Sequence, residues 1–243
     1  MPLFLLMGLI QIGFAVHAVK TGRDTKWLYF ILLFPGVGCA VYFFVEVLPD
    51  LQRSRTVKRA GGSVLDTIDP NRGVRRTAEK LEISNNIDNT VTHAEQCMAR
   101  GRVDEAIKVL QAARKGIFED DPKLLLALAQ AEYEKADFAA AGNTLEHLIA
   151  KNPDFKSVDG HLLYARALEG QGNTDKALAE YAVLAEYYPG PEARCHYGLF
   201  LKKLERMDEA KAQFHQVLLT AKHSPRHYYQ MHRQWIDLAK REA

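Results

Sequence analysis

Gly101-Arg-Val-Asp-Glu-Ala106 begins a pattern that returns three times, as Ala136-Asp-Phe-Ala-Ala-Ala141, Gly172-Asn-Thr-Asp-Lys-Ala177 and Glu205-Arg-Met-Asp-Glu-Ala210. Each copy places a short turn before an alanine, and these alanines follow one another at intervals of 35, 36 and 33 residues. A period of this length is typical of arrays of two-helix hairpins, which bury their apolar faces against one another. The pattern predicts an all-α fold and favours binding over catalysis.

Apolar residues around these alanines recur at intervals of three and four, as in amphipathic helices. In the third copy, Tyr164 and Leu168 precede the turn, and Tyr181 and Leu184 follow it. Pro189 then marks the end of that unit, because proline lacks the amide hydrogen that a continuing helix would use. The spacing predicts about four helix pairs over residues 86–225.

At these residues the chain resembles the tetratricopeptide repeat family, from about Asn86 to Pro225. The first unit matches less closely, because its closing proline is delayed to Pro122 by the extra residues 115–121. The fourth unit delays its proline similarly, so we expect a longer second helix or a loop in both. The resemblance implies an α-solenoid whose first helices line a concave, peptide-binding surface.

First-helix positions that are not needed for stacking are the candidates for that surface. Polar side chains there would set the register of an extended or helical peptide, and an aromatic ring would add contact area. Simple solvation is the alternative for each of them. The lysine and asparagine clamp for a C-terminal carboxylate is not evident, so the class of peptide stays open. The candidates are Lys123, Gln130, Tyr133, Arg166, Glu169 and Lys202.

The last stretch, residues 226–243, reads as an amphipathic helix. Tyr228, Met231, Trp235 and Leu238 follow one another at three- and four-residue intervals, with charges between them. Because an open-ended stack exposes its terminal apolar face, we interpret this segment as a capping helix. A partner-binding helix is the alternative.

The first fifty residues have a different composition. Leu3–Val19 carries no formal charge, and Trp27–Leu48 carries only Glu46. As helices these runs would be roughly 25 and 33 Å long, against a hydrocarbon core of about 30 Å. A short polar turn joins them, so we predict a transmembrane hairpin over residues 1–50. A cleavable signal peptide and a pair of buried core helices are the alternatives; the first lacks a basic start and a small-residue cleavage site.

The second of these runs, from Lys26 to Phe44, also resembles the N-terminal membrane hairpin of cardiolipin synthases and related phospholipase D proteins. Its aromatic run, Phe34-Pro-Gly36 and the following Gly38 and Tyr42 carry the likeness. Those enzymes need a His-x-Lys-x-x-x-x-Asp motif, and no histidine here has a lysine two positions later. The resemblance thus implies an anchor and not an enzyme.

Residues 51–85 form a basic connector with a balance of +4, whereas residues 86–243 have a balance of −2. Basic residues beside a membrane attract anionic headgroups, so Arg53, Arg55, Lys58 and Arg59 are candidates for lipid contact. They also favour a cytoplasmic repeat domain at a bacterial inner membrane, although three basic residues in the hairpin turn oppose this orientation. The repeats show no basic face of the kind that binds nucleic acid.

The sequence contains few motifs that would indicate a disulfide, a catalytic group or a metal site. Cys39 lies in the second apolar run, and Cys97 and Cys195 lie on different repeats, too far apart in a solenoid to bridge, so no disulfide framework is indicated. His196 beside Cys195 does not face it on a helix. Pro225 interrupts the group His223, His227 and His232, which we interpret as surface residues rather than metal ligands.

The sequence therefore predicts a protein that is not an enzyme and has no cofactor or metal. We interpret it as a membrane-anchored scaffold for an unidentified protein or peptide. The alternative is an accessory protein of phospholipid metabolism that acts through the hairpin.

Overall fold

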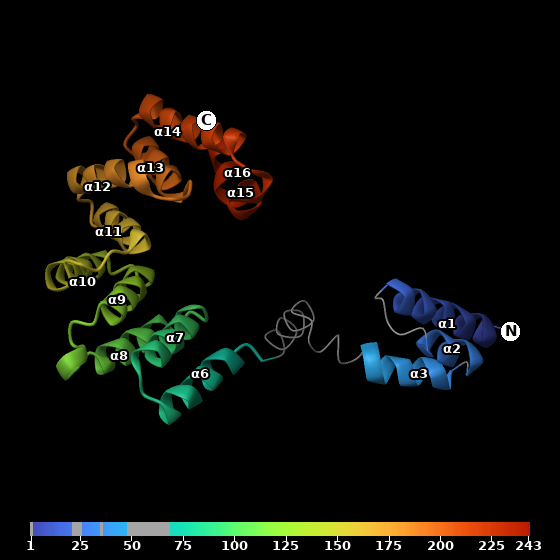
Figure 1. Ribbon diagram of the computed structural model, residues 1–243. Helices are drawn as coiled ribbons and strands as arrows, with labels where there is room; N and C mark the ends of the chain where they lie inside the picture. The colour runs from blue at the N-terminus through green and yellow to red at the C-terminus, as the bar shows by residue number, and fades with distance from the viewer. Residues whose placement is uncertain (1, 21–25, 35, 48–68) are drawn as a thin grey trace. The chain divides into compact units, whose positions relative to one another are not determined.

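Every element in the described part of the chain is a helix or a helical turn (Figure 1). The computed structural model describes residues 2–20, 26–34, 36–47 and 69–243. The chain forms two compact units, Met1–Pro70 and Asn71–Ala243. The all-α class predicted from the alanine period is confirmed.

The N-terminal unit is a small helical cluster. Its core contains Ala18, Ile31, Cys39 and Tyr42. Polar contacts join its helices: the Gln11 side-chain amide donates to the Ile31 carbonyl oxygen at 2.7 Å, and His17 Nδ1 lies 3.0 Å from the Tyr42 hydroxyl. Its elements are α1 (Pro2–Lys20), α2 (Lys26–Leu33), α3 (Val37–Tyr42) and the π-helical turn η1 (Phe43–Val47).

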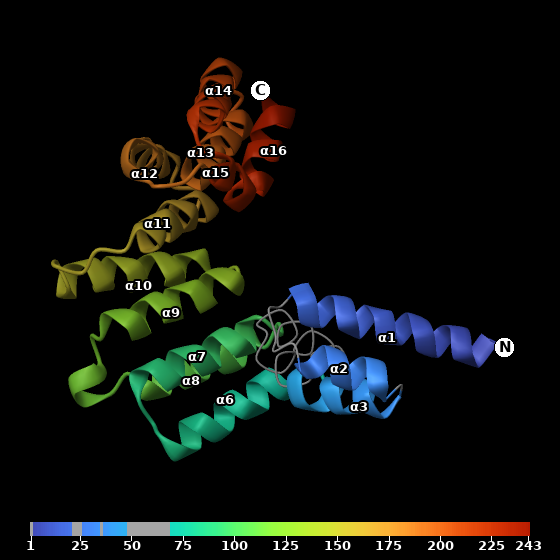
Figure 2. The same ribbon diagram turned by 45° about the vertical axis from the view of Figure 1, so that its right-hand side comes forward.

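The second apolar run of the predicted hairpin is not one continuous helix. Helix α2 ends at Leu33, and α3 begins only at Val37. Gly36 between them has a φ of +95°, which lies outside the helical region and which glycine adopts without a steric penalty. As a result α2 and α3 pack against each other (Figure 2). Across the described ranges we find no helix with both the length and the apolar character needed to cross a membrane.

The second unit is a solenoid of four helical hairpins, preceded by one helix and followed by two short ones. In Figure 1 the hairpins follow one another along a curve, with α7, α9, α11 and α13 on its inner side. The helices are α6 (Arg72–Ile83), α7 (Ile87–Met98), α8 (Val103–Ala113), α9 (Pro122–Glu134), α10 (Phe138–Lys151), α11 (Val158–Gly170), α12 (Thr174–Tyr187), α13 (Glu192–Lys203), α14 (Met207–His223), α15 (Arg226–Met231) and α16 (Arg233–Glu242).

The repeated hexapeptides form the turns between the two helices of each hairpin. Their first residues, Gly101, Ala136, Gly172 and Glu205, all have positive φ, at 71°, 63°, 77° and 61°. In the third unit the Gly172 amide donates to the Glu169 carbonyl, and the Asn173 amide donates to the Leu168 carbonyl. This pair of bonds is the Schellman ending of a helix, and equivalent pairs occur in the other three units. In each hairpin, one residue in the left-handed backbone conformation thus turns the chain from the first helix to the second.

Two of these turns use a residue that disfavours the left-handed region. We expect Ala136→Gly to raise the free energy of unfolding by a few tenths to about 1 kcal/mol, because glycine carries no Cβ penalty at positive φ. The reverse change in an equivalent turn, Gly172→Ala, should lower it by about 1–2 kcal/mol. Urea unfolding of both variants measures the difference. Opposite signs support the turn geometry, whereas equal effects would contradict it.

The alanines that close the hexapeptides lie where the helices of each hairpin cross. Ala106, Ala141, Ala177 and Ala210 are all at most 2% exposed. A small residue at this point lets two helix backbones approach closely, with larger apolar residues packed on either side. The resulting apolar core clusters follow one another along the second unit, from α6 to α16.

The ends of the units refine the predicted boundaries. Residues 115–121 form a loop containing the turn η2 (Gly116–Phe118), and Pro122 is the first residue of α9, where a missing amide hydrogen costs nothing. In the fourth unit the second helix is indeed longer, since α14 has 17 residues.

Both flanks of the repeats differ from the sequence-based boundaries. Residues 72–83, which the sequence grouped with the connector, form α6, and Val74 is buried in the core of the first hairpin. The segment predicted as one capping helix divides at His232 into α15 and α16. Helix α16 packs on α13 and α14 with Ala239 fully buried, as a cap does.

Candidate functional site

The inner side of the solenoid carries a groove between α7, α9 and α11, with a volume of about 300 Å³. Six of its ten lining residues are apolar, and we call these its floor; the other four carry two carboxylates, one amide and one ammonium group. We call it the inner groove; its lining residues are Val91, Glu95, Met98, Lys123, Leu126, Ala127, Gln130, Phe155, Asp159 and Leu163.

Two of the six predicted binding residues line this groove. Lys123 and Gln130 both project from α9. Gln130 donates to Glu134 one helical turn further on, at 3.2 Å. Lys123 Nζ lies 2.8 Å from the Asp88 carboxylate of α7. This ion pair, which is exposed, raises the pKa of Lys123.

The other predicted residues continue along the first helices beyond the groove. The Arg166 guanidinium lies over the Tyr133 ring, 4.7 Å from its centroid, so α9 and α11 are joined by a cation–π contact. Glu169 lies 3.6 Å from Lys203 Nζ and accepts a hydrogen bond from the Tyr181 hydroxyl.

Lys202 completes this series, since its Nζ lies 2.5 Å from the Glu242 carboxylate of α16. Five of the six predicted residues, all but Gln130, therefore make contacts between successive first helices or with α16. Their role in binding a partner stays a prediction. The predicted lipid contacts Arg53, Arg55, Lys58 and Arg59 lie outside the described residues.

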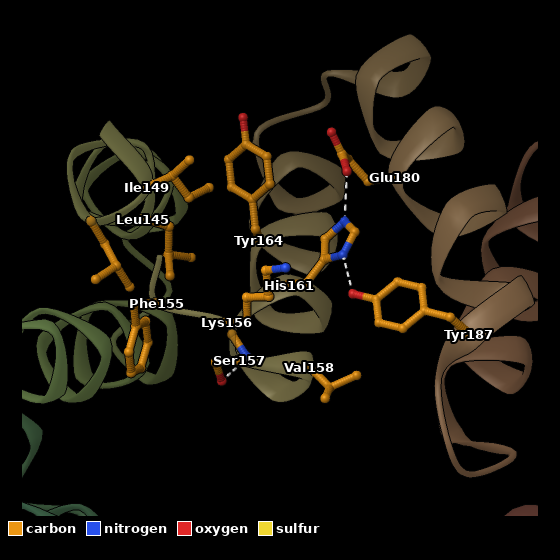
Figure 3. A pocket seen from close by; sticks show the side chains of 12 residues that line it. Leu145, Ile149, Phe155, Lys156, Ser157, Val158, His161, Tyr164, Glu180 and Tyr187 are labelled. Carbon is orange, nitrogen blue, oxygen red and sulfur yellow. Dashed lines mark hydrogen bonds and ion pairs between the residues drawn. The ribbon is translucent and has the colours of Figure 1, made fainter. Parts of the chain in front are cut away.

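A second pocket, of about 450 Å³, lies between α10, α11 and α12 (Figure 3). Leu145, Ile149 and Phe155 form its apolar side. Opposite them, His161 Nε2 lies 2.6 Å from the Glu180 carboxylate, and its Nδ1 lies 2.6 Å from the Tyr187 hydroxyl. Sequence analysis missed this pocket, because its polar residues come from two helices whose spacing depends on the hairpin geometry.

The hydrogen bonds of His161 limit what this pocket can do chemically. One ring nitrogen binds a carboxylate and the other a phenol, so both are already engaged. Burial raises the pKa of Tyr187 above its ordinary value, so this phenol is protonated at neutral pH. The arrangement fixes the shape of the pocket wall and leaves neither nitrogen of the His161 imidazole free for a ligand.

Cys195 and His196, neighbours in the sequence, lie on α13, and both contact Trp235 of α16. The Cys195 thiol donates to the Trp235 carbonyl oxygen at 3.5 Å, and the His196 ring packs against the Trp235 ring. Burial raises the pKa of Cys195 to about 12 and, with the charge of Arg166, lowers that of His196 to about 4. A neutral thiol is a poor nucleophile, so this pair stabilises the packing of α16.

A solenoid of helical hairpins with a groove along its first helices is the architecture of a helical repeat protein. Residues 97–160 and 137–199 each match the family model described as tetratricopeptide repeat. TTC0263, a tetratricopeptide repeat protein of Thermus thermophilus, is similar in structure: the identity is 18%, the TM-score is 0.55, and the match covers 76% of this chain and 94% of that one.

The structure of MamA is also similar, with 20% identity and a TM-score of 0.53 over 70% of this chain and 95% of that one. No curated protein matches the sequence significantly. The family model supports tetratricopeptide repeats over residues 97–199, and the two solved structures support the same helical-repeat fold, as the sequence predicted. They give no support to the resemblance between residues 26–44 and cardiolipin synthases.

Proposed function

We propose that the protein is a scaffold that binds a peptide segment of a partner protein along the inner groove. Tetratricopeptide folds suggest protein or peptide interaction, and the groove supplies a surface of suitable form. The observation that carries the proposal is the apolar floor between three successive first helices. An amphipathic helix or extended segment can bury its apolar side chains there.

The edges of the groove define the partner further. Glu95 and Asp159 both line it, and one oxygen of Asp159 accepts a hydrogen bond from the Tyr188 hydroxyl; the ammonium of Lys123 is paired with Asp88. The groove therefore favours a basic group next to the apolar anchors of the peptide, because opposite charges at a rim steer association and fix the register.

Selection of a peptide library on the full-length chain tests this proposal. We expect selected peptides to combine apolar residues with lysine or arginine, and to bind more weakly to the double variant Tyr133→Ala/Arg166→Glu if they extend along α9 and α11. A double variant on the outer helices, Lys176→Ala/Lys211→Ala, is the control. Failure to select peptides of this apolar and basic character would contradict the proposal, and equal binding to all three proteins would show that the peptides do not extend beyond the groove.

We also propose that the N-terminal unit anchors the chain at a lipid surface. Many of its large apolar side chains are exposed; Tyr29, Leu32, Leu33 and Val37 are 66–74% exposed. Apolar surface of this extent usually marks a contact with a membrane or another protein. The predicted location, a bacterial inner membrane with the repeats in the cytoplasm, remains part of this proposal.

Flotation of the full-length chain with phosphatidylethanolamine/phosphatidylglycerol vesicles tests the anchor. We expect the wild type to float with the vesicles and Leu32→Asp/Leu33→Asp to stay largely in the dense fraction, since each buried carboxylate opposes transfer from water. Ile117→Asp, at an exposed position of the repeat unit, is the control. A wild type that stays in the dense fraction would contradict the proposal.

Exchange of the N-terminal unit distinguishes the scaffold function from the alternative function in phospholipid metabolism. Replacing residues 1–59 by an unrelated membrane anchor leaves a scaffold active but removes an activity that depends on the hairpin itself. Retention of the cellular function after the exchange would reject the lipid-metabolism alternative.

A further inference from the structure

A buried cluster of potential metal ligands lies in the first hairpin, away from the inner groove. His93 and Cys97 are four residues apart on α7 and therefore lie on the same face; they are 4% and 0% exposed. Cys97 Sγ lies 3.8 Å from His93 Nε2. Glu105, from the beginning of α8, completes a set in which one donor atom of each residue lies within 4.8 Å of the others.

The imidazole of His93 is oriented by a residue of another helix. The Thr77 hydroxyl of α6 donates to the backbone carbonyls of Gly73 and Val74, both at 3.0 Å. Its oxygen also lies 2.9 Å from His93 Nδ1. In the Nδ1–H tautomer of His93, the hydroxyl proton goes to a carbonyl and this oxygen accepts from Nδ1–H. The lone pair of Nε2 in that tautomer faces Cys97 and is available to a ligand.

This arrangement is typical of a metal-binding histidine, whose second ring nitrogen donates to a neighbouring oxygen that fixes the tautomer. The spacing also fits. Bonds of about 2.0–2.1 Å to nitrogen and 2.3 Å to sulfur at a tetrahedral angle would place the two donor atoms about 3.6 Å apart. The observed separation of 3.8 Å needs only a small adjustment.

We propose that His93 Nε2, Cys97 Sγ and a carboxylate oxygen of Glu105 bind a zinc-class divalent ion. A donor set of one imidazole, one thiolate and one carboxylate suits Zn²⁺ better than Mg²⁺ or Ca²⁺, which prefer oxygen alone. Glu105 is now paired with Arg102 at the surface, and its partly exposed side chain can turn towards the ion. Three protein ligands leave a fourth position for water on this accessible side.

The site would tie together three helices. His93 and Cys97 belong to α7, Glu105 belongs to α8, and Thr77 brings α6 to the back of the imidazole. An ion there stabilises the N-terminal end of the solenoid, where α6 covers the first hairpin.

Cobalt(II) is the probe for this site, because thiolate ligation produces a sulfur-to-cobalt charge-transfer band that histidines alone do not give. The untagged full-length chain, kept reduced in detergent, is titrated with Co²⁺ and then with Zn²⁺. We expect the band in the wild type, its disappearance when Zn²⁺ displaces Co²⁺, and a rise in Tm of roughly 5–10 °C at a hundredfold excess of zinc over Kd.

Variants separate this cluster from the other histidines and cysteines. Cys97→Ala should lose the band and the zinc-dependent rise in Tm, whereas Cys195→Ala, an equally buried thiol on α13, should keep both. Glu105→Gln changes only a partly exposed side chain, so it should fold normally and bind cobalt more weakly.

Thr77→Val tests the positioning residue: the band should remain at the same wavelength, while the Kd for cobalt rises roughly 10–100-fold. The proposal is overturned if the wild type shows no charge-transfer band, or if Cys97→Ala retains the band and the rise in Tm.

Discussion

Phe214→Ala is expected to lower the free energy of unfolding by about 3–5 kcal/mol. The ring is fully buried on α14 and packs directly against Gly198 of α13. A Cβ at Gly198 would meet the ring at 2.7 Å, so the two helices are as close as this pair permits. Truncation removes the ring that fills the space between α13 and α14, and because the surrounding structure relaxes only partially, a cavity remains.

Urea unfolding gives the size of this effect, and hydrogen exchange gives its location. Since each repeat contacts mainly its neighbours, we expect protection to fall in α13 to α16 and to remain in α7 to α10. Leu219→Ala, which removes a half-exposed side chain of the same helix, should change stability by less than about 0.5 kcal/mol. A uniform loss of protection across all four hairpins would contradict nearest-neighbour coupling.

Leu126→Asp is expected to weaken the binding of peptides selected on the inner groove by about 100-fold or more. Leu126 belongs to the floor of the groove, and burial of an unpaired carboxylate under a bound peptide costs several kcal/mol. Isothermal titration or fluorescence anisotropy with the full-length chain measures the change in Kd.

The matched control places the same carboxylate outside the groove. Leu219→Asp lies on α14, on the outer row of helices, and should leave the Kd unchanged. Leu126 also packs near Gly160, so the variant must first show a wild-type circular dichroism spectrum. Similar losses of affinity in the two aspartate variants would show that peptides do not bind at the groove floor.

The sequence predicted the solenoid well because its signals are local. The turn residues and the alanines of the hexapeptides recur with the period of the hairpins, and both features depend on neighbours within about ten positions. The N-terminal region was harder to predict. Composition alone favoured one long helix over Trp27–Leu48, whereas Gly36 separates α2 from α3.

The candidate sites show the same distinction between local and long-range features. Helical register was enough to choose Lys123 and Gln130, which line the inner groove. It could not reveal that the Arg166 guanidinium would lie over Tyr133, because that contact depends on the distance between two repeats. The four-residue spacing of His93 and Cys97 was visible in the sequence, but Glu105 joins them only after the Gly101 turn folds α8 back onto α7.

If a peptide binds the inner groove as proposed, we expect the contacts between successive first helices to respond to it. Lys123 with Asp88, Arg166 with Tyr133, and Glu169 with Lys203 each join two neighbouring hairpins. A peptide that recruits one of these groups replaces a bond between repeats instead of adding one. We therefore expect occupancy of the groove and the curvature of the solenoid to be coupled, and added salt, which screens the two ion pairs, to relax both together.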